Sequence, residues 1–581
     1  MRTSSRAIAA AGVLALAASA QVIGAQDRPE SILPPGFGEP AAAPTTRATS
    51  APLPGDPPGA VVQPLPAAPA SPTATPSATP TPVDPATLAL YEMPPFARRS
   101  LDRIGVAGGG IAADAFGDAD GRMIEALMRR TAAPLPSRWL SILLRRTLVA
   151  AIDTPRGVDG ADFAAERAWL LLRMGESVAA RAVVQGVDNG DYTPKLYQVA
   201  ANAWLATGDP AGMCPVVEAA NTATPEPAWT FARPLCAALR GEPARARALF
   251  ASARRGRSAN GVDLLLAQKV MGAAADGRQA VTIEWDGVDR LTAWRFGLAA
   301  ATGVAIPDAL YATTGRQAYY WRALAPGVAL ADRVAPAEAA AGQGVLSNVA
   351  LVDLYAAVAA DPDAASAPSA AAQDLRIAYA GSGADARLAA LRQLWGGTPT
   401  WPRLVLTAHA AARQPVRGDV DAVDPLVASM LSAGLDRHAA RWAAVAPAGG
   451  DAWAMIALAD PDARRRLSGS DVQGYGGGEA RRRLFFAGLA GLGRLAPDDV
   501  STTAEALGVR IGAENSWTRA LDRAVTRDQP GTVALLAAIG MQTPDWRGVP
   551  PAALYRIVAA LRAVGLSGEA RMIAAEAIAR G

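Results

Sequence analysis

A pattern that decides the fold occurs three times in the first half of the chain: AWLLLRMGESVAARAVV at residues 168–184, ANAWLATGDPAGMCPVV at 201–217 and PLCAALRGEPARARALF at 234–250. The glycines at the centre of the three copies are 33 residues apart: Gly175, Gly208 and Gly241. An apolar run precedes each glycine, and an acidic residue and a second alanine-rich or valine-rich run follow it. Glycine favours the left-handed end of a helix, and proline favours the first turn of the next one. The pattern therefore predicts three successive helix pairs.

This repeat resembles the tetratricopeptide (TPR) family, whose unit of about 34 residues forms two helices around a small residue at the turn. The resemblance covers residues 163–255, and the tyrosine usual after the glycine is missing. It implies a stack of helix hairpins with a concave binding face, and it implies no enzymatic activity.

The rest of the body is also predicted to be helical. Five apolar residues fall on one stripe of a helix that begins near residue 138: Leu140, Leu143, Leu144, Leu148 and Ile152. VTIEW at 281–285 is the one β-like run, and it has no convincing partner strand. We predict an all-α fold: an α-solenoid of TPR-like hairpins at 98–400 and a C-terminal helical domain at 401–581. Whether the body divides near 396–400 stays open.

Residue types that usually perform catalysis are scarce. The chain has two histidines, His409 and His438, and only two of its 56 basic residues are lysines, Lys195 and Lys269. This composition excludes a three-histidine zinc site and leaves few positions for a general-base lysine. Two cysteines cannot hold a four-cysteine zinc or iron–sulfur site. We therefore predict no catalytic residues, no metal and no cofactor. The net charge of +3 does not favour a nucleic-acid partner.

The amino terminus has the pattern of an export signal. Arg2 and Arg6 precede a short apolar run, and small residues follow up to Ala25, which is typical of a cleaved signal peptide at 1–25. The alternative is an uncleaved N-terminal anchor. Residues 26–97 are rich in proline, which removes backbone donors and fixes φ, so they predict a disordered linker. We expect an exported, periplasmic protein with no integral membrane segment after signal cleavage.

The two cysteines fit the predicted repeat. Cys214 follows Gly208 in the second helix of unit two, and Cys236 precedes Gly241 in the first helix of unit three. Because these helices are neighbours in a TPR-like stack, the resemblance places the two thiols within reach of each other. In an oxidising compartment we expect a disulfide, and two buried free thiols are the alternative.

Two arginine triplets on either side of a glycine-rich loop form a candidate anion-binding site. Guanidinium groups bind phosphate and carboxylate as planar forks, so converging triplets would hold the anionic groups of an envelope polymer. The alternative is that these side chains form the solvated faces of two helices. The candidate residues are Arg464, Arg465, Arg466, Tyr475, Arg481, Arg482 and Arg483.

A second function class rests on two fragments that are similar to parts of lytic transglycosylases. AENSW at 513–517 and GMQ at 540–542 resemble a Glu-Ser pair and a Gly-Leu-Met-Gln segment of that family. Here Asn515 interrupts the pair. The resemblance implies that Glu514 would be the catalytic acid, and this role requires a deep cleft around it.

These observations predict an exported, non-enzymatic helical-repeat scaffold that binds another protein of the cell envelope. The alternative function is a cell-wall glycan-binding or glycan-cleaving protein.

Overall fold

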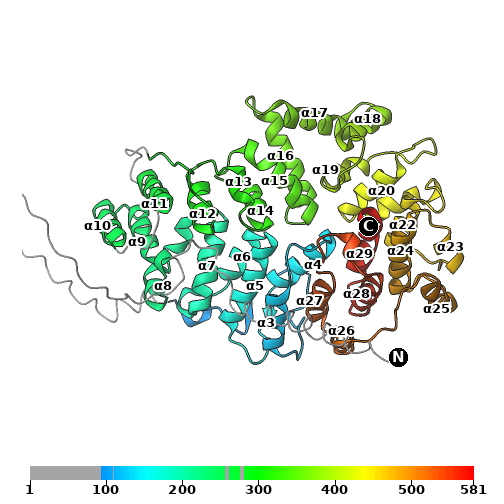
Figure 1. Ribbon diagram of the computed structural model, residues 1–581, viewed down its shortest axis with the longest axis horizontal. Helices are drawn as coiled ribbons and strands as arrows, with labels where there is room; N and C mark the ends of the chain where they lie inside the picture. The colour runs from blue at the N-terminus through cyan, green and yellow to red at the C-terminus, as the bar shows by residue number, and fades with distance from the viewer. Residues whose placement is uncertain (1–92, 109, 225, 256–260, 275–280) are drawn as a thin grey trace, which may run out of the picture. The chain divides into compact units, whose positions relative to one another are not determined.

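The computed structural model describes residues 93–581 except 109, 225, 256–260 and 275–280 (Figure 1). The predicted signal peptide at 1–25 and the predicted linker up to residue 92 lie outside these residues. The remainder of the linker contains a 3-10 turn, η1 (Pro95–Ala97). The described residues from Arg99 to Gly581 belong to one compact unit. The division into 98–400 and 401–581 stays a prediction.

Helices make up nearly all of the described elements, which confirms the all-α class (Figure 1). One small antiparallel sheet, which the sequence did not predict, pairs β1 (Arg103–Ile104) with β2 (Ile152–Asp153). Ile152 therefore lies in a strand and not on the predicted helix, because α4 (Arg138–Val149) ends before it. The β-like run at 281–285 forms no strand. Within the described part of the chain, no helix has the length and apolarity to span a membrane.

The helices that precede residue 275 are α3 (Gly121–Arg130), α4, α5 (Gly160–Met174), α6 (Ser177–Val184), α7 (Pro194–Ala206), α8 (Val217–Ala223), α9 (Pro227–Leu239), α10 (Pro243–Arg255) and α11 (Gly261–Ala274). Those up to residue 400 are α12 (Ala293–Ala301), α13 (Asp308–Tyr311), α14 (Arg316–Leu324), α15 (Leu330–Gln343), α16 (Asn348–Ala360), α17 (Ser366–Ala380) and α18 (Ala384–Trp395).

The C-terminal helices are α19 (Trp401–Ala411), α20 (Val423–Ser432), α21 (Asp436–Ala440), α22 (Asp451–Ala459), α23 (Gly469–Gln473), α24 (Gly478–Leu492), α25 (Pro497–Ala506), α26 (Ser516–Thr526), α27 (Pro530–Gly540), α28 (Pro551–Ala563) and α29 (Ser567–Arg580). Further 3-10 turns are η2 (Asn189–Asp191), η3 (Pro210–Met213), η4 (Arg441–Ala444) and η5 (Trp546–Gly548).

The three glycines of the repeat adopt the left-handed conformation that their positions predict. The φ angles of Gly175, Gly208 and Gly241 are 88°, 69° and 75°. At Gly175, which ends α5, a Cβ atom would also lie 2.5 Å from the ring of Tyr320 on α14. Glycine is required there for both backbone conformation and space.

Proline interrupts the second helix of the second unit. The chain after Gly208 forms η3 and resumes a helix only at Val217. Pro215 lies between the two segments, and a proline inside a helix removes a backbone donor and clashes with the preceding turn. Cys214 therefore follows a 3-10 turn, which corrects its predicted place within a helix. It still lies at disulfide distance from Cys236 on α9, with the sulfur atoms 2.02 Å apart.

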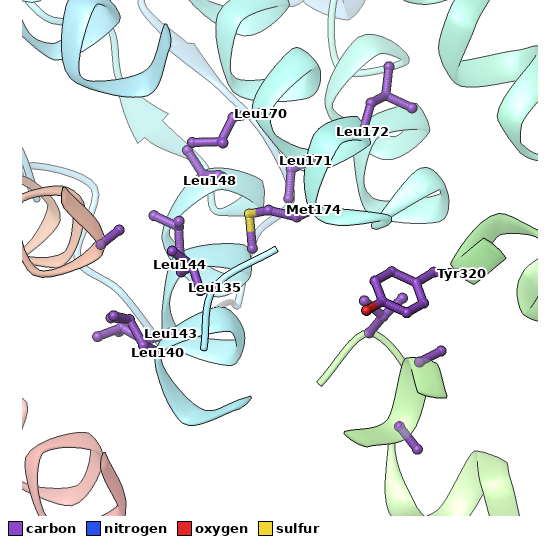
Figure 2. Close-up of a cluster of buried hydrophobic side chains, with 14 of the residues drawn as sticks. Leu135, Leu140, Leu143, Leu144, Leu148, Leu170, Leu171, Leu172, Met174 and Tyr320 are labelled. Carbon is purple, nitrogen blue, oxygen red and sulfur yellow. The ribbon is translucent and has the colours of Figure 1, made fainter. Parts of the chain in front are cut away.

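The core between α4 and α5 is built from leucine side chains. Leu140, Leu143, Leu144 and Leu148 of α4 are 0–1% exposed, as their helical stripe predicts. In Figure 2, Leu144 and Leu148 lie beside the labelled α5 residues Leu170, Leu171 and Met174, and Leu140 and Leu143 lie farther along α4. This packing joins the start of the body to the first repeat unit.

Helix α4 also contacts the end of the chain. It packs against α27 and α29 as well as α5 and α6, and Figure 1 shows it beside α27 and α29. The carboxylate of Glu576 on α29 accepts hydrogen bonds from the backbone N–H groups of Arg138 (2.8 Å) and Trp139 (3.1 Å). It also accepts one from the hydroxyl of Ser137 (2.6 Å). A carboxylate of the last helix therefore caps a helix near the start of the body.

A buried carboxyl group, Glu176, makes the stability depend on pH. It lies between α5 and α6, is 4% exposed, and its Oε1 atom is 3.2 Å from Nη1 of Arg145. Burial raises the pKa of Glu176 from 4.5 to about 7, although Arg145 and Arg138 act to lower it. Between pH 4.5 and 7 the folded protein therefore binds more protons than the unfolded chain. The stability that the protonated Glu176 contributes is lost as the pH rises through this range.

We expect the free energy of unfolding to fall by about 2 kcal/mol, through the ionisation of Glu176, when the pH is raised from 5.5 to 8. The Glu176→Gln variant, which cannot ionise, should lose this part of the pH dependence. Urea unfolding at the two pH values measures it. Glu505→Gln, at an exposed position on α25, should keep the wild-type dependence. Equal pH dependence in wild type and Glu176→Gln would contradict the expectation.

Candidate functional site

The candidate site lies at α9 and α10, the last helices of the repeat region, and at α11, which follows them (Figure 1). The left-handed Gly241 follows α9, and Pro243 occupies the first position of α10, as the repeat predicts. Helix α10 packs on α9, and α11 packs on both α9 and α12. Helices α10 and α11 therefore flank α9.

A small apolar cluster, separate from the main core, joins these three helices. Ala237 and Ala238 of α9 are buried against Ala246 of α10, and Leu249 and Met271 pack on them. Three alanines leave little side-chain volume at this position, and the neighbouring helices do not fill it. A pocket of about 720 Å³ remains between α10 and α11.

We call this pocket the α10–α11 groove. Its apolar part includes Phe250, which is 7% exposed and contacts Phe231 edge to face, and Met271 from α11. The full lining consists of Ala238, Pro243, Ala246, Arg247, Phe250, Ala251, Arg254, Arg255, Gln268, Met271 and Gly272. The groove thus combines an apolar floor with three cationic side chains, and none of the described residues that line it is acidic.

The groove arginines Arg247, Arg254 and Arg255 are exposed. None of the three forms an ion pair with another residue in the described part of the chain. The acidic residues nearby already have partners: Glu242 pairs with Arg240 and Arg245, and the buried Asp263 of α11 pairs with Arg295. The groove therefore carries uncompensated positive charge beside an apolar surface, a combination suited to an anionic, partly apolar ligand.

The structure uses Tyr475 and the second arginine triplet internally. Tyr475 is fully buried and its hydroxyl donates to Asp451 at 2.7 Å. Arg481 binds Asp451 and the carbonyl of Gly477, while Arg482 donates two hydrogen bonds to the carbonyl of Tyr475. Arg483 pairs with Glu479. The contacts of Tyr475, Arg481 and Arg482 hold the glycine-rich loop against α22 and α24, whereas the Arg483–Glu479 pair lies within α24.

The first triplet, Arg464–Arg466, is exposed on the connection that precedes α23 and not on a helix. The structure does not bring it together with Tyr475, whose side chain faces the core. Anion binding by the seven predicted residues stays a prediction, and it now depends on the first triplet.

Glu514, the residue on which the glycan-cleaving hypothesis depends, is exposed on the connection before α26. The exposed setting differs from the deep cleft that the catalytic role requires. The neighbouring Asn515 caps α26, where its side chain accepts a hydrogen bond from the backbone N–H of Thr518. Among the described residues, no group of three His, Cys, Asp or Glu side chains is placed to hold a metal ion.

Sequence reasoning missed the α10–α11 groove. A signal was present, since ARARALFASARR at 244–255 has arginines without acidic residues among them. The pattern does not reveal whether another helix covers those arginines, because the outcome depends on how α11 packs.

No family model, no curated protein and no solved structure matches this chain.

Proposed function

We propose that this chain is an exported, non-enzymatic helical-repeat protein, with a TPR-like α-solenoid segment, that binds another protein of the cell envelope. The α10–α11 groove is its docking site. The observation that carries the proposal is this groove between α10, the last helix of the repeat region, and α11. Export is supported by the N-terminal sequence pattern and by the cysteine pair, which suits an oxidising compartment.

Helix packing gives the physical reason for a protein partner. A helix that ends an array leaves a face which an additional helix would cover, and natural arrays usually place polar residues there. Here the partly exposed Met271 lines the groove together with the buried Phe250. A helix from another protein would bury this apolar surface. The glycan-cleaving alternative has no comparable support, because Glu514 is exposed.

Affinity purification of the full-length protein from its envelope fraction, after mild crosslinking, tests the proposal. The test variant is Ala251→Trp, which places an indole in the groove from an exposed position on α10. The control is Ala248→Trp, which is exposed on the same helix and does not line the groove.

We expect one protein to co-purify with the wild type and with Ala248→Trp, and to be lost with Ala251→Trp. Equal recovery with all three proteins would show that the partner binds elsewhere. Recovery of glycan fragments without a protein partner would reject the scaffold function and favour the glycan alternative.

A further inference from the structure

We infer that the α10–α11 groove recognises an acidic amphipathic helix of its partner. This inference rests on the proposed function and adds the chemistry of the ligand. Its basis is the combination of the uncompensated groove arginines with an apolar floor, in a space between two helices.

The spacing of the charges indicates an extended ligand. Arg247 and Arg254 are seven residues apart on α10, so the helix rise separates their backbone positions by about 10 Å. A single carboxylate or phosphate group would engage one of them. A helix lying along α10 has carboxylates at the same interval when it carries Glu or Asp seven residues apart. Seven residues are close to two helical turns, so both carboxylates lie on one side of the ligand.

The apolar floor of the groove indicates that the ligand helix also has an apolar face. Phe250, Met271 and Ala246 come from facing sides of α10 and α11 and line the groove between the arginines. Apolar residues of a helix at i, i+3, i+4 and i+7 form a stripe that fits such a groove. A flanking acidic stripe then reaches the guanidinium groups. A basic helix would meet three like charges, and the described residues of the lining include no acidic side chain to offset them.

The concave shape of the groove favours a helix over a membrane surface as its binding partner. Peripheral membrane sites present apolar side chains outward to the headgroup region. In the groove, Phe250 is 7% exposed and Ala246 is 1% exposed, so the apolar floor is recessed below the exposed arginines. A ligand must enter the groove to reach it, and a helix with projecting side chains can do so.

Fluorescence anisotropy with labelled synthetic helices tests the inference on the full-length protein. The probe is a peptide of about 14 residues, as long as α10, with leucines at i, i+3, i+4 and i+7 and glutamates seven residues apart. A second peptide replaces the glutamates with lysines, and a third replaces the leucines with serines. Vesicles of phosphatidylglycerol test the membrane alternative.

The protein variants are Arg247→Gln/Arg254→Gln and, as a control with the same change of net charge, Arg519→Gln/Arg523→Gln on α26. The control arginines are exposed and lie outside the groove. We expect the acidic peptide to bind the wild type at least about tenfold more tightly than the other two peptides. The groove variant should lose about tenfold in affinity, and the control should stay within about twofold.

Two results would overturn the inference. One is equal binding of the acidic and lysine peptides, and the other is binding of the anionic vesicles in place of the acidic peptide. If Ala251→Trp still abolishes capture of the partner protein, either result leaves the proposed function standing with a different ligand chemistry. If no protein is captured at all, the proposed function fails whatever the peptides do.

Discussion

Replacing Glu576 with alanine is expected to lower the free energy of unfolding by about 4 kcal/mol. Its side chain is buried, and its oxygens accept from Ser137, from two backbone N–H groups of α4 and from Arg580. Alanine leaves these donors without an acceptor in a buried place, and each unsatisfied group costs stability. Because the contacts join α29 to α4, the loss should appear in the unfolding of the whole unit.

Urea unfolding followed by far-ultraviolet circular dichroism measures this effect. Glu576→Gln keeps one acceptor oxygen, so it should lose less stability than Glu576→Ala. Glu505→Ala removes a glutamate from an exposed position on α25 and should change the free energy by less than about 0.5 kcal/mol. If Glu576→Ala were as stable as Glu505→Ala, the contact between α4 and α29 would not hold the ends of the unit together.

Replacing Arg167 with methionine is expected to lower the free energy of unfolding by about 3 kcal/mol or more. The guanidinium group of Arg167 on α5 is fully buried and donates to the carbonyls of Leu148, Ile104 and Ala150. Burial lowers the pKa of Arg167 to about 9, so the group remains charged at neutral pH. The charge lies at the carboxyl end of α4, where the helix dipole favours a cation.

Methionine fills a similar volume and leaves the three carbonyls without their donor. Arg167→Lys should recover only part of the loss, because a lysine is a single point donor and cannot reproduce the planar fork. Arg122→Met, at an exposed position on α3, is the matched control and should stay within about 0.5 kcal/mol of the wild type. A stable Arg167→Met protein would show that the carbonyls find other donors.

The disulfide adds a further constraint on the repeat region. Cys214 and Cys236 close a loop with a sequence separation of 22 residues. Restricting a loop of this length in the unfolded chain contributes about 3 kcal/mol in the chain-entropy model. The bond joins the segment between η3 and α8 to α9, the helix on which both walls of the α10–α11 groove rest. The Cys214–Cys236 disulfide thus stabilises the helix that carries the proposed docking site.

The sequence by itself determined the local features of this protein. Apolar periodicity predicted the helices and the buried stripe of α4, because both depend on the spacing of side chains along one segment. The 33-residue repeat predicted the left-handed glycines Gly175, Gly208 and Gly241, because these depend on backbone conformation at a helix end. The repeat also placed the two cysteines within reach of each other.

Only the tertiary structure decided which polar side chains face inward. The sequence pattern predicted Arg481 and Tyr475 to be either ligand-binding or solvated. In the structure both bind Asp451 on α22. Glu576 has no local feature that marks it as the cap of α4, which lies more than 400 residues earlier. The α10–α11 groove likewise exists because α11 packs on α9 and α12 and leaves one face of α10 open. Such outcomes depend on which surfaces meet across the chain, and the order of residues within one helix does not contain that information.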